Sequence, residues 1–192
     1  MSSSRPRCAT AADYARRMLE SAAGLDFHPA ATDELAEARA IASQMMSHEV
    51  ASEATLGAIL AIQPASTLFL CEAGAVTGMV STLLLRAEAE PVLRAGEFDG
   101  LTPDEALLAR GRDEASLYYV WGIAGATKEA RAAVMDLMHR FRFGVLADLT
   151  AYAVAATRVG RYVGVTQLGF TPVRHPGDNL IVSLPQLARV AA

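Results

Sequence analysis

Cysteine is scarce in this sequence. Among 192 residues there are two, Cys8 in a polar N-terminal stretch and Cys71 inside the apolar run TLFLC. This placement argues against a disulfide framework and fits a reducing compartment, with Cys71 as a buried thiol. We therefore expect a cytoplasmic protein. A chain of this length buries a core without disulfides or metals, so a single folded domain is expected.

Metal and nucleophile motifs are also missing. His48 begins an HE pair, but Ser52 stands where the zinc motif HExxH needs its second histidine. His28, His139 and His175 have no cysteine or second histidine at ligand spacing in the sequence. There is no GxSxG elbow and no Walker loop. The sequence predicts no metal site.

Excess positive charge and long hydrophobic spans are absent as well. The net charge of −4 and pI near 5.6 disfavour a nucleic-acid partner. From residue 55 to residue 85 the only charged residue is Glu72. However, Gln63, Pro64 and a turn over 72–78 divide this run into pieces shorter than the roughly 20 apolar residues of a membrane span. We expect no membrane partner.

Hydrophobic periodicity and turn residues predict an alternating order of helices and strands. The predicted helices are 12–23, 31–49 with Thr32 as N-cap, 52–62, a short capped helix within 101–111 that starts at Thr102, 127–143 and 158–168. The predicted strands are 25–30, a hairpin over 66–87, 116–124, 149–156 and two short strands flanking the turn RHPGDN. This order predicts an α/β fold with a mixed central sheet and helices on both faces.

Residues 87–115 interrupt this pattern. They contain eight acidic residues against three arginines. A charge run of this kind is either a solvated surface excursion or an insertion whose carboxylates attract a cationic amine.

Three phrases of the sequence resemble landmarks of the GNAT superfamily of N-acetyltransferases, in the family's order. FHPAATDELAEA resembles its first strand and helix, with His28 where an arginine is usual. FLCEAGAVTGMVS is similar to its central hairpin, in which Gly74 and Gly78 fit the two glycine positions. QLGFTPV is similar to its closing phrase, with the pair Gly169-Phe170. The resemblance covers residues 25–184 and implies a GNAT-like mixed sheet.

The family's pyrophosphate loop, Q/R-x-x-G-x-G/A, is matched in part. Aligned on the end of the predicted strand, Lys128, the only lysine, takes the Q/R position, while Arg131 and Ala133 take the glycine positions. The resemblance implies that Lys128, Arg131, Ala132 and Ala133 hold the coenzyme A pyrophosphate at a helix N-terminus. Alternatively, Lys128 is an exposed charge, and Arg131 either crowds the phosphate or binds it directly.

The resemblance also implies catalytic positions. Backbone N–H groups of Ile123 or Ala124 would stabilise an oxyanion. The tyrosine that the family often uses as general acid is replaced by Val165, and Tyr162, one helical turn earlier, is the candidate substitute. Packing on an amphipathic helix is the alternative for Tyr162. Arg158 replaces the asparagine that the family often has at the start of this helix.

These observations lead to one hypothesis with two alternatives. The hypothesis is an N-acyltransferase that uses acetyl-CoA or another acyl-CoA and a small-molecule or peptide amine, as a monomer or a homodimer. The alternatives are a non-catalytic GNAT-like coenzyme A sensor or interaction scaffold, and an acyl-homoserine-lactone synthase. The expected organisation is a tail and helix over 1–24, the GNAT-like domain over 25–184 with an insertion at 87–115, and a C-terminal tail over 185–192.

Overall fold

The computed structural model describes residues 11–45, 49–173 and 179–185. The predictions for Cys8, His48 and His175, for most of the RHPGDN turn, and for the two ends of the chain at 1–10 and 186–192 lie outside these residues.

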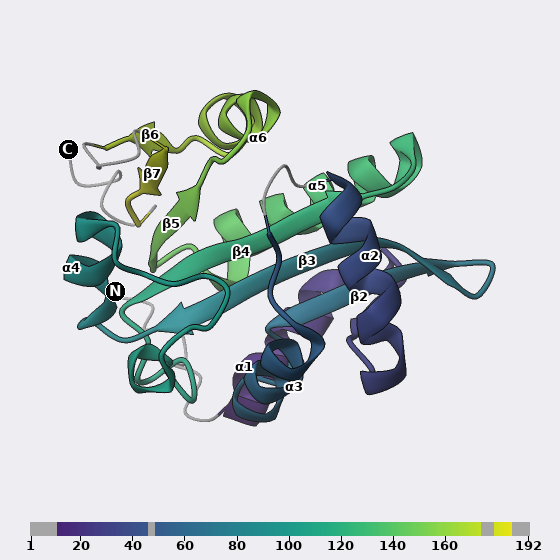
Figure 1. Ribbon diagram of the computed structural model, residues 1–192, viewed down its shortest axis with the longest axis horizontal. Coiled ribbons are helices and arrows are strands. Elements are labelled where there is room, and N and C mark those ends of the chain that lie inside the picture. The colour runs from purple at the N-terminus through teal and green to yellow at the C-terminus, as the bar shows by residue number, and fades with distance from the viewer. Residues whose placement is uncertain (1–10, 46–48, 174–178, 186–192) are drawn as a thin grey trace, which may run out of the picture.

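A mixed sheet forms the centre of the molecule, with the strand order β1-β2-β3-β4-β5-β7-β6 (Figure 1). Its strands pair antiparallel except β4 with β5, which are parallel. The strands are β1 (Phe27–Pro29), β2 (Thr67–Glu72), β3 (Ala75–Leu85), β4 (Leu117–Gly125), β5 (Thr150–Val154), β6 (Thr171–Pro172) and β7 (Leu180–Ser183). The predicted α/β fold class is confirmed.

The predicted hairpin is β2 and β3, joined by Ala73 and Gly74. Both residues have positive φ, 52° and 83°, which matches the backbone twist that two-residue hairpin turns require. Alternate residues of β2 and β3 face opposite sides of the sheet, and most of them on each side are buried. The sheet is therefore covered on both faces.

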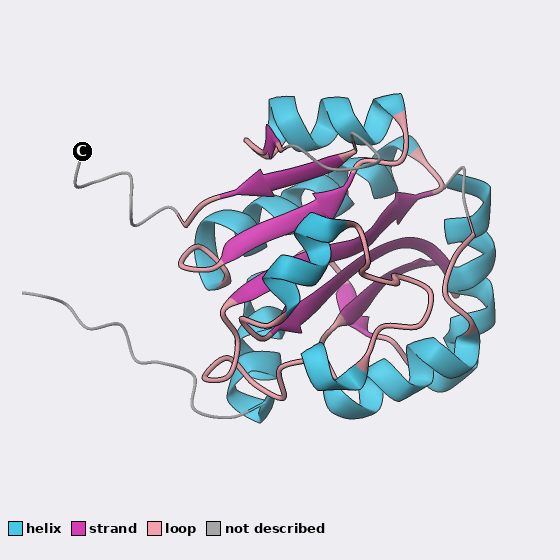
Figure 2. Cartoon of the chain, turned by 60° about the vertical axis from the view of Figure 1, so that its left-hand side comes forward, coloured by secondary structure: helices cyan, strands magenta, loops and turns pink. Residues whose placement is uncertain are grey.

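Helices lie on both faces of this sheet (Figure 2). Helices α1 and α5 pack on one face, while α2, α3 and α4 contribute to the hydrophobic clusters on the other. The helices are α1 (Ala11–Ala22), α2 (Leu35–Met45), α3 (Glu53–Ile62), α4 (Ala89–Ala95), α5 (Lys128–Arg140) and α6 (Arg158–Tyr162). Short 3-10 turns are η1 (Thr32–Glu34) and η2 (Glu105–Leu107), and π-helical turns are η3 (Phe141–Val145) and η4 (Val163–Gln167).

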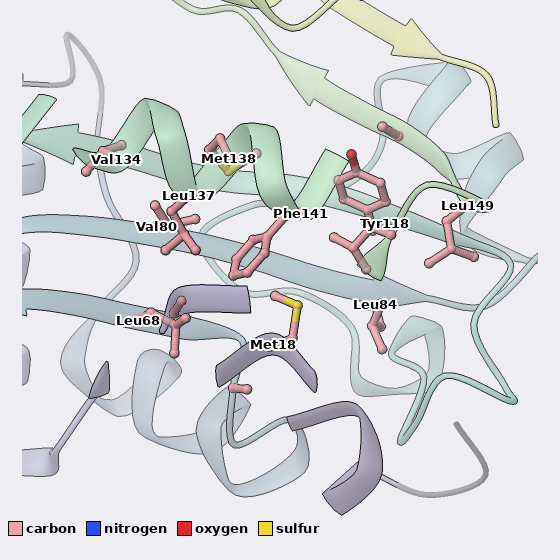
Figure 3. Close-up of a cluster of buried hydrophobic side chains, with 14 of the residues drawn as sticks. Met18, Leu68, Val80, Leu84, Tyr118, Val134, Leu137, Met138, Phe141 and Leu149 are labelled. Carbon is pink, nitrogen blue, oxygen red and sulfur yellow. The ribbon is translucent and has the colours of Figure 1, made fainter. Parts of the chain in front are cut away.

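The core under α5 fixes the position of this helix against β3 and β4 (Figure 3). Leu137 and Met138 of α5 are fully buried and lie over Val80 of β3. Met18 brings α1 into the same cluster, so the first helix packs in the core of the sheet. Burying an aliphatic side chain of this size is worth about 1.5–3 kcal/mol.

Two predicted helix starts are wrong. The helix expected from Thr32 begins with η1, because the Glu34 carboxylate accepts the Ala31 N–H at 3.0 Å and Thr32 is not the cap. The helix expected from Thr102 is only the turn η2, capped by Asp104, whose carboxylate accepts the Ala106 N–H at 2.9 Å.

Tertiary contacts explain the second error. Leu108 is buried and forms a bridge with Leu85 at the end of β3, which draws the backbone out of a helical path. The buried Gln63 side chain donates to Leu84 O at 2.8 Å and Ala109 O at 2.7 Å, and accepts from the Leu84 N–H at 3.0 Å. The same region contains α4, which the sequence analysis did not predict. The helix predicted over 158–168 is divided into α6 and the wider turn η4.

Candidate functional site

Strands β4 and β5 separate along their length. They are paired only from Leu117 to Val120 on β4 and from Thr150 to Ala153 on β5. Beyond Val120, β4 continues to Gly125 without β5 beside it, and Figure 1 shows β5 turning away. The carboxyl ends of two parallel strands therefore border an opening, which is where α/β sheets commonly bind ligands.

A β-bulge in β4 marks the start of this opening. The register with β3 runs from Ser81 opposite Gly122 to Thr82 opposite Val120, so Trp121 has no partner. Past the bulge, the Ala126 N–H donates to Thr77 O at 2.8 Å.

N–H groups alternate in direction along a strand, which decides which amides of β4 face the opening. Because the Ala126 N–H points toward β3, the Ala124 N–H also points toward β3. The N–H groups of Ile123 and Gly125 point toward the opening. Of the two predicted oxyanion donors, the Ile123 N–H faces the opening and the Ala124 N–H faces β3.

A cavity of about 1010 Å³ occupies the opening and passes through the sheet. On one face it is bordered by α5 and η4, through Val134, Met135 and Gly164. On the other it is bordered by α2, through Ala38 and Ala42. Between them lie the unpaired half of β4 and residues 153–157 at the end of β5. A cavity lined by residues from both faces has room for two molecules to meet between the strands.

The N-terminus of α5 lies at one side of this cavity. Thr127 caps the helix: its hydroxyl accepts the Ala130 N–H at 3.0 Å and its carbonyl accepts the Arg131 N–H at 3.1 Å. Within the described chain, the amides of Lys128 and Glu129 have no such partner, as expected for the first turn of a helix. These two amides and the helix dipole favour an anion at this position.

Helix α5 approaches β4 closely enough to require Gly125. A Cβ at Gly125 would lie 2.7 Å from the Arg131 amide nitrogen and 2.9 Å from its Cα. Both are backbone atoms, which cannot turn away as a side chain does. Gly125 therefore fixes the distance between the end of β4 and the first turn of α5.

The structure brings four of the six predicted cofactor residues to the cavity wall: Ile123, Ala124, Arg131 and Ala132. Lys128 is exposed at the first position of α5, outside the lining residues, and Ala133 packs against the core. The amides of Arg131, Ala132 and Ala133 lie beyond the first turn and bond within the helix. Only side chains at these positions are available to a ligand.

The predicted catalytic tyrosine is not brought to this site. Tyr162 is 59% exposed at the end of α6 and is not among the residues that line the cavity, whereas its helical neighbours Gly160 and Val163 are. Val165 packs against the core, and Arg158 is exposed at the first position of α6. The geometry does not support Tyr162 as an acid for a ligand in the cavity.

Tyr119, unlike Tyr162, lines the cavity. It lies on β4, directly before Val120, which is the last residue of β4 that pairs with β5. Burial raises the pKa of Tyr119 to about 12, although a hydrogen bond with the backbone of Val154 acts in the opposite direction. The phenol therefore stays protonated at neutral pH. Only the separation of β5 from β4 identifies the Tyr119 hydroxyl as a candidate donor.

The acid-rich segment reaches the other mouth of the cavity. Phe98, Gly100 and Leu101 line it, and the Trp121 indole N–H donates to Gly100 O at 2.7 Å. The loop is thus held over the bulge of β4. Of the described residues that line the cavity, three are charged: Arg39, Glu49 and Arg131.

A second cluster of reactive side chains lies away from this cavity, at the β1–β2 edge. The sequence places no cysteine or second histidine at ligand spacing from His28, but the fold brings a ligand atom from each of His28, Glu34 and Cys71 within 4.8 Å of the others. Pairing of β1 with β2 brings together residues 43 positions apart. Cys71 is half-buried rather than buried. Desolvation is the largest cause that raises the pKa of its thiol, and the hydrogen bond to Glu34 is the second.

Comparisons with known proteins agree with this architecture. No protein-family model and no curated protein matches the sequence. The solved structures that match include the GphF GNAT-like decarboxylase in complex with isobutyryl-CoA, at 13% identity and a TM-score of 0.50, and the loading GNATL domain of CurA from Lyngbya majuscula, at 11% and 0.53. They cover 83% and 84% of this chain, and 99% and 98% of their own. The fold is GNAT-like. At these identities the likeness establishes the GNAT-like fold and not the chemistry.

No helix in the described part of the chain combines the length and the apolar character that crossing a membrane would require.

Proposed function

We propose that this GNAT-like protein binds an acyl-coenzyme A between β4 and β5 and transfers the acyl group to an amine. The observation that carries the proposal is the cavity of about 1010 Å³ that passes through the sheet beside the N-terminus of α5. The isobutyryl-CoA complex of the GNAT-like GphF supports an acyl-CoA as the ligand class. That complex supports only the class of ligand, and the transfer of the acyl group to an amine is our proposal.

In this proposal the pyrophosphate binds the amides of Lys128 and Glu129, and the Arg131 guanidinium adds a charged contact. The pantetheine arm carries amides of its own. It lies along β4 and accepts a hydrogen bond from the Gly125 N–H, which leaves the Ile123 N–H, also facing the opening, for the thioester carbonyl.

The amine enters from the α2 side, past the loop 96–101. It attacks the thioester carbonyl, and the Ile123 N–H stabilises the oxyanion that forms. Collapse of the intermediate breaks the carbon–sulfur bond. Tyr119 donates a proton to the departing sulfur, and the proton lost by the amine nitrogen restores the phenol, so the exchange is balanced.

A non-catalytic coenzyme A binding protein is the second candidate. The observation in its favour is the composition of the wall, because the described lining residues include no histidine and one carboxylate, Glu49. An amine whose deprotonation needs a strong general base would find little help there.

Calorimetric titration with coenzyme A tests the binding part of the proposal. We expect Lys128→Glu and Arg131→Glu each to weaken binding by about tenfold or more, since each places a carboxylate beside the phosphates. Arg39→Glu, on the α2 side of the same cavity, is the matched control and should leave coenzyme A affinity unchanged. If the wild-type protein produces no binding heat, the proposal is wrong.

Release of free thiol from acetyl-CoA in the presence of a panel of amines separates the two candidates. Amine-dependent release identifies a transferase. Binding without amine-dependent release identifies the non-catalytic protein.

A further inference from the structure

We propose that His28, Glu34 and Cys71 form a Zn²⁺ site with a fourth, solvent-facing position. The three residues come from β1, η1 and β2, and their side chains converge at the edge of the sheet. The site lies outside the cavity wall and does not depend on the function proposed above.

The spacing of the three ligand atoms fits a tetrahedral zinc ion. His28 Nε2 lies 3.3 Å from Cys71 Sγ and 3.4 Å from Glu34 Oε1, and the Sγ to Oε1 distance is 3.5 Å. Zn–N and Zn–O bonds of about 2.0–2.1 Å and a Zn–S bond of about 2.3 Å at tetrahedral angles give ligand separations of about 3.3–3.6 Å. An ion displaced from the plane of this triangle toward the fourth position would lie at bonding distance from all three atoms.

The second ring nitrogen of His28 prepares the first for coordination. Nδ1 lies 3.0 Å from Pro29 O, and a carbonyl only accepts hydrogen bonds, so Nδ1 carries the proton. In the neutral ring, Nε2 then presents its lone pair to Cys71 and Glu34. Backbone contacts of this kind orient metal-binding histidines in proteins.

The types of ligand select the metal. A thiolate, an imidazole and a carboxylate together suit Zn²⁺, whereas Mg²⁺ and Ca²⁺ bind almost entirely through oxygen. The side chains of His28 and Glu34 are 40% and 23% exposed, so water can reach the fourth position. Three protein ligands and one open position are typical of zinc sites that keep an exchangeable ligand.

The ion would fasten η1 and the start of α2 to the edge of the sheet. Glu34 ends η1, and α2 follows directly with Ala38, Arg39 and Ala42 in the wall of the cavity. Zinc binding is therefore expected to raise the melting temperature of the protein, because the folded state holds the ligands together and the unfolded state does not.

Cobalt(II) spectroscopy on the untagged full chain tests this site. Cys8 is the only other cysteine, so Cys8→Ser leaves Cys71 as the single thiol. Cobalt added to Cys8→Ser should produce a thiolate-to-metal charge-transfer band that saturates at one equivalent, and zinc should displace it. His28→Ala should weaken cobalt binding by more than about 100-fold, because loss of a residue that only supports a metal ligand costs about 10–100-fold. His139→Ala is the histidine control and should bind as the parent does.

Alkylation of Cys71 by iodoacetamide gives a second readout that needs no ligand variant. In Cys8→Ser, one equivalent of zinc should slow the alkylation of Cys71 by about tenfold or more, and a chelator should restore the rate. If cobalt gives no charge-transfer band and zinc gives no protection, the three side chains form only a hydrogen-bonded cluster and the proposal is overturned. A band or protection that persists in His28→Ala would also overturn it.

Discussion

Replacing Gly125 by alanine should separate α5 from β4. The added Cβ would lie 2.7 Å from the Arg131 nitrogen and 2.9 Å from its Cα, whereas comfortable contacts lie at about 3.5–4.0 Å. The first turn of α5 must therefore retreat by about half an ångström or more. Overpacking of this kind costs about 1–3 kcal/mol. For a chain of this size, each kcal/mol lowers the melting temperature by about 2–4 °C.

The displacement should also be visible in ligand binding. It moves the amides of Lys128 and Glu129, on which the proposed pyrophosphate site depends. Loss of one charge-assisted hydrogen bond corresponds to about a tenfold fall in coenzyme A affinity or more. Thermal melting measures the first effect and calorimetry the second.

Gly57→Ala is the matched control. Gly57 lies inside α3, and a Cβ there would meet nothing within 4 Å. Alanine in a helix interior is expected to stabilise by about 0.5–1 kcal/mol. If Gly125→Ala melts at the wild-type temperature, α5 does not contact β4 as closely as described.

Three further predictions follow from individual side chains. Tyr152 donates to Glu90 Oε1 at 2.6 Å, and this bond lowers the pKa of Glu90 from its ordinary 4.5. A lowered carboxyl pKa stabilises the folded protein above pH 4.5, and this stabilisation is lost as the pH falls through the folded-state pKa of Glu90. Tyr152→Phe should therefore lower the free energy of unfolding by about 1 kcal/mol at neutral pH, after allowance for partial exposure, and change it little in acid. Urea unfolding at both pH values measures this, and an equal cost in acid would contradict it. Tyr119→Phe should lower turnover by about tenfold or more with unchanged coenzyme A affinity, and an unchanged rate would remove Tyr119 from the mechanism. If the acid-rich segment attracts a cationic amine, the double variant Glu97→Gln with Glu105→Gln should have a lower kcat/KM at low salt. Its kcat/KM should also fall less than that of the wild type as added salt shortens the Debye length to about 8 Å. A wild-type salt profile would leave the segment as a solvated surface.

Local patterns predicted the elements that local chemistry determines. The β2–β3 hairpin follows from two apolar runs around a turn predicted over 72–78, and the observed turn is shorter, Ala73 and Gly74 alone. Helix α5 begins beside Thr127, within one residue of its predicted start. These features depend on residues that are close in sequence, so periodicity and capping suffice to find them.

Features that depend on distant contacts could not be predicted. The bulge at Trp121 is a property of the β3–β4 register, and the side chain of His28 meets Cys71 only because β1 pairs with β2. Arg142 reads as a surface residue but is fully buried, with its guanidinium donating to Ser183 Oγ and, at 2.9 Å, to Leu184 O. No periodic pattern in the sequence indicates such a partner for a buried arginine.

A crystal structure with a hydrolysis-resistant thioether analogue of acetyl-CoA tests the central claim most directly. We predict that the pantetheine arm lies between β4 residues 121–125 and the end of β5, within hydrogen-bonding distance of the Gly125 amide, and that the acyl end of the analogue lies beside the Ile123 amide. The pyrophosphate should lie against the amides of Lys128 and Glu129. If, at a saturating concentration, the analogue is absent from the opening between β4 and β5 or binds elsewhere on the protein, the proposed function is contradicted.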